Sequence, residues 1–139
     1  KVFEFVSEVI PVSAKIEFEL RSLSPEDRAE YLKSLGIEKS GLDILIPQVF
    51  YALGLINFLT AGEKEVRAWT IEKGTDAQHA AGAIHSDFER NFVRAAVIPF
   101  EEFVKYRGWK GAQEAGKVRY EGKEYIVQDG DVVEFMVNA

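Results

Sequence analysis

The chain has 139 residues, 47% of them hydrophobic and 29% charged, with a formal net charge of −6 at pH 7. This length suits one domain, or one small domain with an appendage. The acidic balance excludes a bulk nucleic-acid binder, so any contact with nucleic acid has to come from a local basic patch. The chain contains no cysteine, which excludes disulfides and thiolate metal sites, and no apolar run has the length of a membrane span. We expect a cytoplasmic protein without membrane contact and, because the chain lacks an initiator Met, a fragment of a longer one.

Residues 1–55 predict one strand followed by two helices. Four consecutive apolar residues at 9–12 suit a strand that is buried on both faces. Ser24 and Ser40 are N-caps for two helices, and the first of these ends at Gly36. The second helix contains Pro47, which predicts a kink, and it carries apolar residues at helical spacing. These two helices predict an α-helical hairpin.

Residues 56–139 predict alternating strands and short helices. Strand patterns at 57–60 and 66–71 predict an antiparallel pair, and Thr75 or Asp76 caps a helix over residues 78–90. The remaining predicted elements are a strand at 92–98, short helices between 99 and 115, a hairpin of 118–120 with 125–127, and a strand at 132–137. The turn before that last strand explains the carboxylates of Asp129 and Asp131. This order is typical of an α+β fold with a β-grasp, ubiquitin-like sheet.

Three long motifs in this second part resemble one known family. They are EVRAWTIEKGT (65–75), AAGAIHSDFERNFVRA (80–95) and GKEYIVQDGDVVEFMVN (122–138). All three are similar to the C-terminal TGS domain of the Obg-like ATPase (YchF) family. The resemblance implies a β-grasp TGS domain over residues 56–139. It also implies that residues 1–55 hold the terminal strand and helical hairpin of a P-loop nucleotide domain.

The same resemblance implies a function and its partners. The family is a cytosolic, ribosome-associated P-loop ATPase, so the parent protein would hydrolyse ATP with Mg²⁺. The TGS domain would dock onto the ribosome or RNA. Its other partner would be the upstream nucleotide domain of the same protein, and neither DNA nor a membrane is an expected partner. The rival interpretation is a free-standing β-grasp module that binds a protein or a small nucleotide-like effector.

Ser13-Ala14-Lys15 is the expected contribution of this chain to a nucleotide site. In P-loop GTPases and their relatives, S-A-K after the last strands forms the loop whose backbone contacts the nucleotide base. By resemblance, Ser13, Ala14 and Lys15 have this role, while the residues alone equally allow Ser13 to be a plain helix N-cap. The phosphate-binding motif G-x-x-x-x-G-K-[ST] is absent. We therefore expect this chain alone to hold neither ATP nor Mg²⁺.

A second candidate site is the sheet face opposite the helix of residues 78–90. Alternation along residues 66–71 and 92–98 places Arg67, Trp69 and Arg94 together on that face. An aromatic ring with flanking arginines can stack a base and hold phosphate, so these three residues predict an RNA or partner contact. The alternative is that Trp69 packs on the preceding helices and that the arginines pair with Glu65 or Glu89.

The two histidines do not predict a metal site. His79 and His85 are six residues apart, so they do not share a face of one helix, and no cysteine completes a zinc set. Surface or capping roles are the expectation for both.

Overall fold

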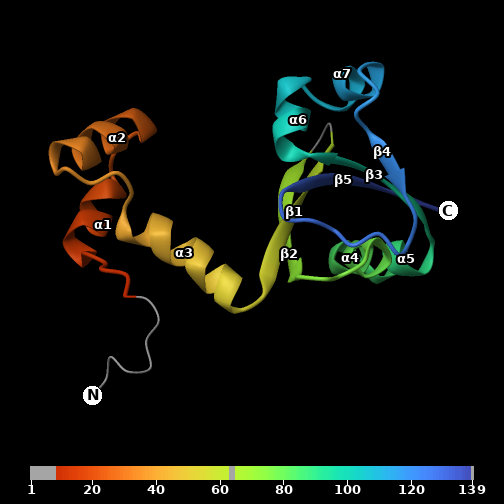
Figure 1. The fold of residues 1–139 in the computed structure, drawn as a ribbon, viewed down its shortest axis with the longest axis horizontal. Coiled ribbons are helices and arrows are strands. Elements are labelled where there is room, and N and C mark those ends of the chain that lie inside the picture. Colours follow the sequence, from red (N-terminus) through yellow and green to blue (C-terminus); the bar gives the residue numbers. More distant parts are fainter. Residues whose placement is uncertain (1–8, 63–64, 139) are drawn as a thin grey trace. The chain divides into compact units, whose positions relative to one another are not determined.

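The computed structural model describes residues 9–62 and 65–138. It divides the chain into two compact units, Lys1–Leu53 (unit 1) and Gly54–Ala139 (unit 2), which are shown in Figure 1. The described residues form a mixed α+β structure, and each unit is taken by itself below.

The described part of unit 1 consists of three helices, α1 (Ala14–Leu20), α2 (Pro25–Ser34) and α3 (Gly41–Ala52). Ser24 and Ser40 cap α2 and α3, as predicted, because each side chain accepts a hydrogen bond from the backbone of the first turn. After α2, Gly36 has a φ of +70° and the N–H of Ile37 donates to the Leu32 carbonyl at 3.0 Å. This left-handed closure confirms the predicted end of the first helix.

The predicted strand at residues 9–12 is wrong. Residues 9–13 form no regular element, and α1 follows directly. A strand needs a neighbour to take its N–H and C=O groups, and the described residues of unit 1 contain no other strand. The segment lies instead on the first turn of α3, where a Cβ on Gly41 would be only 2.9 Å from Cα of Val12.

The apolar stripe of α3 is exposed rather than buried. Helical spacing predicted a buried face, yet no residue of α3 is buried, and Leu53, which follows the helix, is 65% exposed. The helices of unit 1 are short, so they supply little apolar surface to cover one another. The predicted hairpin therefore has the expected helices and caps, and among residues 9–53 only Leu20, Leu32 and Ser40 are buried.

Ser40 is expected to contribute strongly to the start of α3. Its Oγ accepts from the Asp43 N–H at 3.2 Å, and Asp43 Oδ2 accepts in return from the Ser40 N–H at 3.3 Å. Removing the hydroxyl breaks this capping box, so Ser40→Ala should lower the free energy of unfolding by about 1 kcal/mol, whereas Ser40→Thr should retain most of it. Urea unfolding followed by circular dichroism at the helix band measures both, and equal midpoints for the two variants would contradict this role.

Unit 2 is built on a five-stranded sheet, described here for residues 54–62 and 65–138. Its strands are β1 (Leu55–Ala61), β2 (Val66–Glu72), β3 (Phe92–Pro99), β4 (Arg119–Glu121) and β5 (Asp131–Val137). Their order across the sheet is β2-β1-β5-β3-β4. β1 and β5 are parallel and the other pairs are antiparallel, which confirms the predicted pairing of the first two strands of this unit.

Helices cover both faces of this sheet. Helices α4 (Ala77–Ile84) and α5 (Ser86–Arg90) lie on one side in Figure 1, and α6 (Phe100–Lys105) and α7 (Trp109–Glu114) lie on the other. Val97 packs with Ala77 and Ala80 of α4, whereas its neighbour Ile98 packs with Ala112 of α7. Because both faces are covered, β3 is buried continuously near its end instead of alternating.

Two predicted elements of unit 2 differ from the structure. The helix predicted over 78–90 is interrupted at His85, which is extended and caps α5 through its Nδ1. Residues 125–127 do not form a hairpin with β4, since Tyr125 accepts from the Ala77 N–H at 2.8 Å and Val127 donates to Thr75 at 3.1 Å. The Tyr125 ring packs against the core under α4, and its hydroxyl accepts from Arg119 of β4 at 3.0 Å, so this segment contacts β4 through side chains.

The predicted turn before β5 is confirmed in detail. Gly130 has a φ of +78°, and Asp129 Oδ1 accepts from the Asn57 N–H at 2.8 Å. Asp131 is buried, where its Oδ2 accepts from the Gln128 N–H at 2.9 Å and from the Tyr125 hydroxyl at 2.8 Å. Burial, and then this hydrogen bond to Asp131, raises the pKa of Tyr125 to about 12. Asp131 thus closes the turn, whereas Asp129 ties the turn to β1.

Candidate functional site

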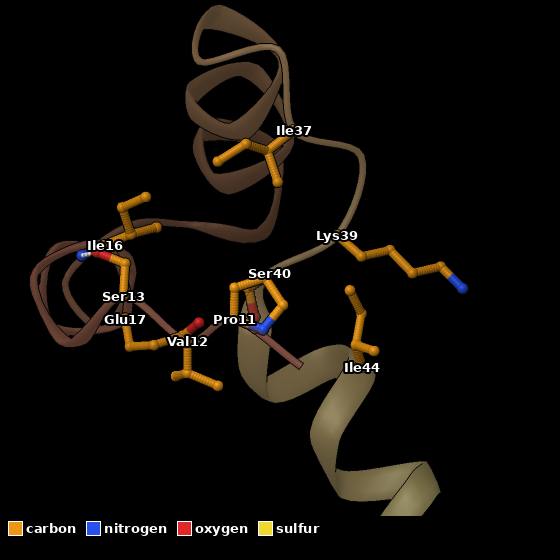
Figure 2. Close-up of a pocket in the computed structure, with 10 residues that line it drawn as sticks. Pro11, Val12, Ser13, Ile16, Glu17, Ile37, Lys39, Ser40 and Ile44 are labelled. Carbon is orange, nitrogen blue, oxygen red and sulfur yellow. Dashed lines mark hydrogen bonds between the residues drawn. The ribbon is translucent and has the colours of Figure 1, made fainter. Parts of the chain in front are cut away.

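Unit 1 contains a cavity of about 440 Å³ where α1 and α3 begin, shown in Figure 2. Its apolar lining consists of Pro11, Val12, Ile16, Ile37 and Ile44. The polar groups of the lining are mostly used by the fold, since Ser13 and Ser40 cap helices and Glu17 Oε1 accepts from the Leu42 N–H at 3.2 Å. The side chain of Lys39 extends away from the apolar residues in Figure 2. The cavity thus offers an apolar surface bordered by one lysine of its lining.

Of the three residues predicted to form the nucleotide-base loop, Ser13 lines this cavity and the other two do not. Ser13 Oγ accepts from the Ile16 N–H at 3.4 Å as the N-cap of α1, so the alternative capping role is present. Ala14 is the first residue of that helix. Lys15 is exposed, with its Nζ 3.9 Å from Glu19 Oε1. Contact between these residues and a nucleotide base stays a prediction.

Trp69 lies on the sheet face that α4 covers, and the predicted outward orientation is wrong. It pairs in register with Phe58, and directly paired residues of antiparallel strands share a face. Phe58 belongs to the buried core beneath α4, and the half-buried Trp69 packs against that core. Its Nε1 also donates to Thr60 Oγ1 at 2.9 Å. Packing of Trp69, the alternative considered above, is therefore observed, although its neighbours are the sheet core and α4.

Arg67 and Arg94 lie on opposite faces of the sheet. The guanidinium of Arg67 is 4.2 Å from the centre of the Trp69 ring, on the α4 face. Side chains at i, i+2 and i+4 of a strand face the same side, so Arg94 shares its face with Ile98. This is the face that α6 and α7 partly cover. There its guanidinium is 4.6 Å from the centre of the exposed Tyr120 ring.

The structure therefore does not bring Arg67, Trp69 and Arg94 together on one face. The register of β3 with β5 shifts between Phe92 and Arg94, and the residues beyond are buried on both sides. In β3 the predicted arrangement is present, because Ala95 and Val97 pack toward α4 and Arg94 lies on the other face. The prediction fails in β2, where Val66 is exposed although it is apolar, and Trp69 and Ile71 face the core.

The stretch from Gly111 to Lys117 has the G-x-x-x-x-G-K spacing of a phosphate-binding loop, but its structure differs from one. Val118 occupies the position that needs Ser or Thr. Gly111 lies inside α7 and Gly116 follows that helix with a φ of +64°, so the segment ends a helix instead of leading from a strand into one. It presents no helix N-terminus to a phosphate.

His79 forms an ion pair with the N-cap of its own helix. Its Nδ1 is 2.8 Å from Asp76 Oδ1, and its Nε2 is 4.0 Å from Glu89 Oε1. The hydrogen bond and charge of Asp76, with a smaller effect of Glu89, raise the pKa of His79 above its ordinary 6.5. Burial acts to raise the pKa of Asp76, but hydrogen bonds from His79 outweigh it and lower that pKa below its ordinary 3.8.

This pair predicts a pH dependence that one substitution removes. The pair stabilises the fold below pH 6.5 and loses that effect as the pH rises through the raised pKa of His79. It loses the effect at the acid end as the pH falls through the lowered pKa of Asp76. Asp76→Asn keeps an oxygen for the helix cap and removes the charge, so the pKa of His79 should fall. A proton NMR titration of the His79 ring measures this, and identical curves for wild type and variant would contradict the pairing.

Neither a metal site nor a membrane span is found in the part of the chain that the structure describes. No group of three or more His, Asp or Glu side chains there is placed to hold a metal ion. None of the described helices combines the length and the hydropathy that crossing a membrane requires.

Comparison with known proteins places unit 2 in one family. The model of the C-terminal domain of YchF GTPases, described as a "Protein of unknown function (DUF933)", matches residues 55–138. The "Structure of the Schizosaccharomyces pombe YchF GTPase" superposes with a TM-score of 0.80 and 40% identity, and the match covers 92% of this chain and 34% of that one.

Curated relatives extend the match into unit 1. The "Ribosome-binding ATPase YchF" of Bacillus subtilis (strain 168) is 54% identical over 132 residues, which are 95% of this chain and 36% of the relative. The protein of the same name from Escherichia coli O157:H7 is 51% identical over the same shares. The chain thus spans about a third of the length of these relatives. Since the family model matches more than half of the residues, this chain belongs to the family of YchF GTPase C-terminal domains.

Proposed function

We propose that this chain is the docking part of a YchF-type ribosome-binding ATPase. The observation that carries the proposal is the 54% identity, across 95% of the chain, with a protein named for ribosome binding and ATPase activity. In this proposal unit 2 contacts the ribosome, and an upstream nucleotide domain hydrolyses ATP with Mg²⁺. The ribosome would also place the protein in the cytoplasm.

Unit 2 is proposed to be a TGS domain of the β-grasp type. The strand order β2-β1-β5-β3-β4, with β1 and β5 parallel at the centre, supports this assignment. So does α4, which connects the first pair of strands to β3 and packs on one face of the sheet. Unit 1 would then be the end of the nucleotide domain.

The cavity of unit 1 is proposed to lie on the base side of that nucleotide domain. Its apolar lining suits the flat face of a base, and Ser13 lies at its edge as the resemblance implies. Ala14 and Lys15, which lie outside the lining, would contribute through the backbone at the start of α1.

This proposal predicts that the chain alone does not hydrolyse ATP or GTP. The complete phosphate-binding motif is absent from the sequence. The unchanged chain and Lys15→Ala should therefore release the same amount of phosphate, at the background level. A malachite-green phosphate assay on a clean preparation measures both. Release that depends on the protein and falls in the variant would contradict the prediction.

The roles of Arg67, Trp69 and Arg94 in partner contact stay predictions. Since Arg94 lies on the other face from the stacked pair of Arg67 and Trp69, one RNA segment on one face cannot engage all three. Arg67→Glu and Arg94→Glu should therefore act independently if both faces contact a partner.

Filter binding of the labelled chain to purified 30S and 50S ribosomal subunits tests the proposed function. The expected result is saturable binding to one subunit that weakens as salt increases. An absence of binding to both subunits, from a chain shown by circular dichroism to be folded, would overturn the proposal.

A further inference from the structure

We propose that the exposed cations around α6 and α7 bind the phosphate backbone of RNA. They are Lys105, Arg107, Lys110 and Lys117, called the basic surface below. The inference rests on the proposed function and deepens it, because it names the part of unit 2 and the chemistry by which docking would occur.

The basic surface is a local reversal of charge. Residues 100–118, which span α6 and α7, contain these four cations and three acidic residues, Glu101, Glu102 and Glu114, whereas the whole chain has 17 basic and 23 acidic residues. All four cationic side chains are exposed. An acidic protein that binds a polyanion needs such a concentrated patch, since the rest of its surface repels phosphate.

Side chains of α6 and α7 that pack against the sheet hold the backbone of the basic surface in place. The ring of Trp109 is 5.3 Å from that of Phe103, centre to centre, and its Nε1 donates to the Ala61 carbonyl at 2.8 Å. Ala112 is fully buried against the same core. Between the helices, Gly111 approaches the carbonyl of Tyr106 so closely that no Cβ fits. The cations therefore stand on a fixed platform, which lowers the entropic cost of binding.

Arg107 occupies a backbone conformation that disfavours it. Its φ is +58°, the one positive value at a non-glycine residue among the residues described. The turn itself is an ordinary helix end, in which Arg107 N–H donates to Val104 and Gly108 N–H donates to Phe103. Glycine would meet that geometry with less strain. An arginine at such a position, with its side chain exposed, is consistent with a role for the guanidinium.

Two of the four cations of the basic surface already face a carboxylate. Lys105 and Lys117 flank Glu102 at 3.6 Å and 3.9 Å, and the Oε2 that Lys117 approaches is buried. Among the described residues, no carboxylate lies within 4.0 Å of the charged groups of Arg107 or Lys110. Free guanidinium and ammonium groups match phosphate oxygens, and Arg can bind two of them at once.

Paired neutral substitutions test whether this surface binds RNA. Arg107→Gly with Lys110→Gln removes two cations, and Lys73→Gln with Lys123→Gln removes two from other loops of unit 2 as the matched control. Binding of the full chain to extracted ribosomal RNA and to ribosomal subunits is measured between 50 and 200 mM salt. At 0.1 M salt the first pair should weaken both by on the order of 10- to 100-fold and reduce the salt slope by about 2, while the control changes neither.

Arg107→Gly alone separates binding from folding. It should reduce the salt slope by about 1. Because glycine relieves the positive φ, its melting temperature should stay the same or rise. Weaker binding with an equal or higher melting temperature supports a binding role. A lower melting temperature would show that Arg107 serves the fold and would overturn its place in the surface.

The remaining outcomes distinguish this proposal from the proposed function. If the chain binds subunits and the two paired variants bind equally, the basic surface is overturned and the proposed function stands. If the first pair weakens binding to subunits but leaves binding to extracted RNA unchanged, the surface contacts a ribosomal protein and the RNA proposal is overturned. The same conclusion follows if Phe100→Ala alone abolishes binding to subunits. If the unchanged chain binds neither probe, both proposals fail.

Discussion

Gly111→Ala is expected to lower the free energy of unfolding of unit 2 by about 3 kcal/mol. A Cβ at this position would lie 2.1 Å from the carbonyl oxygen of Tyr106, which belongs to the backbone at the end of α6. No rotamer change relieves that contact, so α7 has to move away from α6. Ala112 of α7 packs with Ile98 and Val132 in the core between α7 and the sheet. Movement of α7 therefore also opens that core.

Gly82→Ala is the matched control for this prediction. Gly82 also lies inside a helix, and an added Cβ there would meet Glu89, at 2.5 Å from its Oε2. The end of that half-buried side chain can move aside, and alanine favours helix over glycine by about 1 kcal/mol. The two variants should therefore differ sharply in stability, with Gly82→Ala near the unchanged chain. Equal stability of the two would contradict the close approach of α6 and α7.

Phe58→Ala is expected to lower the free energy of unfolding of unit 2 by about 3–5 kcal/mol, the usual loss when a buried aromatic residue is replaced by alanine. Phe58 is 0% exposed at the centre of the core under α4. Its ring packs edge-on to that of Phe135, with 5.7 Å between centres. Removing it leaves a cavity that rigid neighbouring strands cannot fill.

Phe100→Ala serves as the control, because Phe100 is 50% exposed and lies in the same unit. Both tryptophans of the chain, Trp69 and Trp109, belong to unit 2, so tryptophan fluorescence during urea unfolding reports on that unit alone. The midpoint should fall strongly for Phe58→Ala and little for Phe100→Ala. Similar midpoints for the two variants would contradict the burial of Phe58 in the core under α4.

Local signals in the sequence predicted the ends of elements well. Ser24, Ser40 and Asp76 each accept a backbone hydrogen bond in the first turn of the helix that follows. Such caps depend on residues within one turn, so they can be read without knowledge of the fold. The pair of β1 and β2 was also predictable, because the two strands are adjacent in the sequence and are joined by a short loop.

Features that depend on distant contacts were not accessible in this way. Residues 125–127 look like a hairpin partner for β4 but lie beside residues 75–77, where the Tyr125 ring packs under α4. The face of Trp69 could not be predicted from alternation because Val66 and Ala68 are apolar and yet exposed, while the opposite set, with Trp69 and Ile71, faces the core. Residues 9–12 have the composition of a strand, yet composition does not supply a partner strand.

The basic surface shows both kinds of information. A count of charges along residues 100–118 would have found it, since four cations stand there with three carboxylates in an acidic chain. The positive φ of Arg107, which sets it apart from the other cations of the surface, is known only from the backbone of the structure. No sequence pattern marks a non-glycine residue at such a position with certainty.

Competition for ribosomes tests most directly the claim that this chain is the docking part of a longer ATPase. Purified 70S ribosomes carrying the labelled, intact Bacillus subtilis relative, which is 54% identical to this chain where they match, are titrated with the unlabelled chain. If the chain docks as proposed, it displaces the relative completely, at concentrations near its own dissociation constant for the ribosome. A chain that is folded and saturating yet leaves the relative bound would contradict the account, because docking would then reside in the part of the relative that this chain does not match.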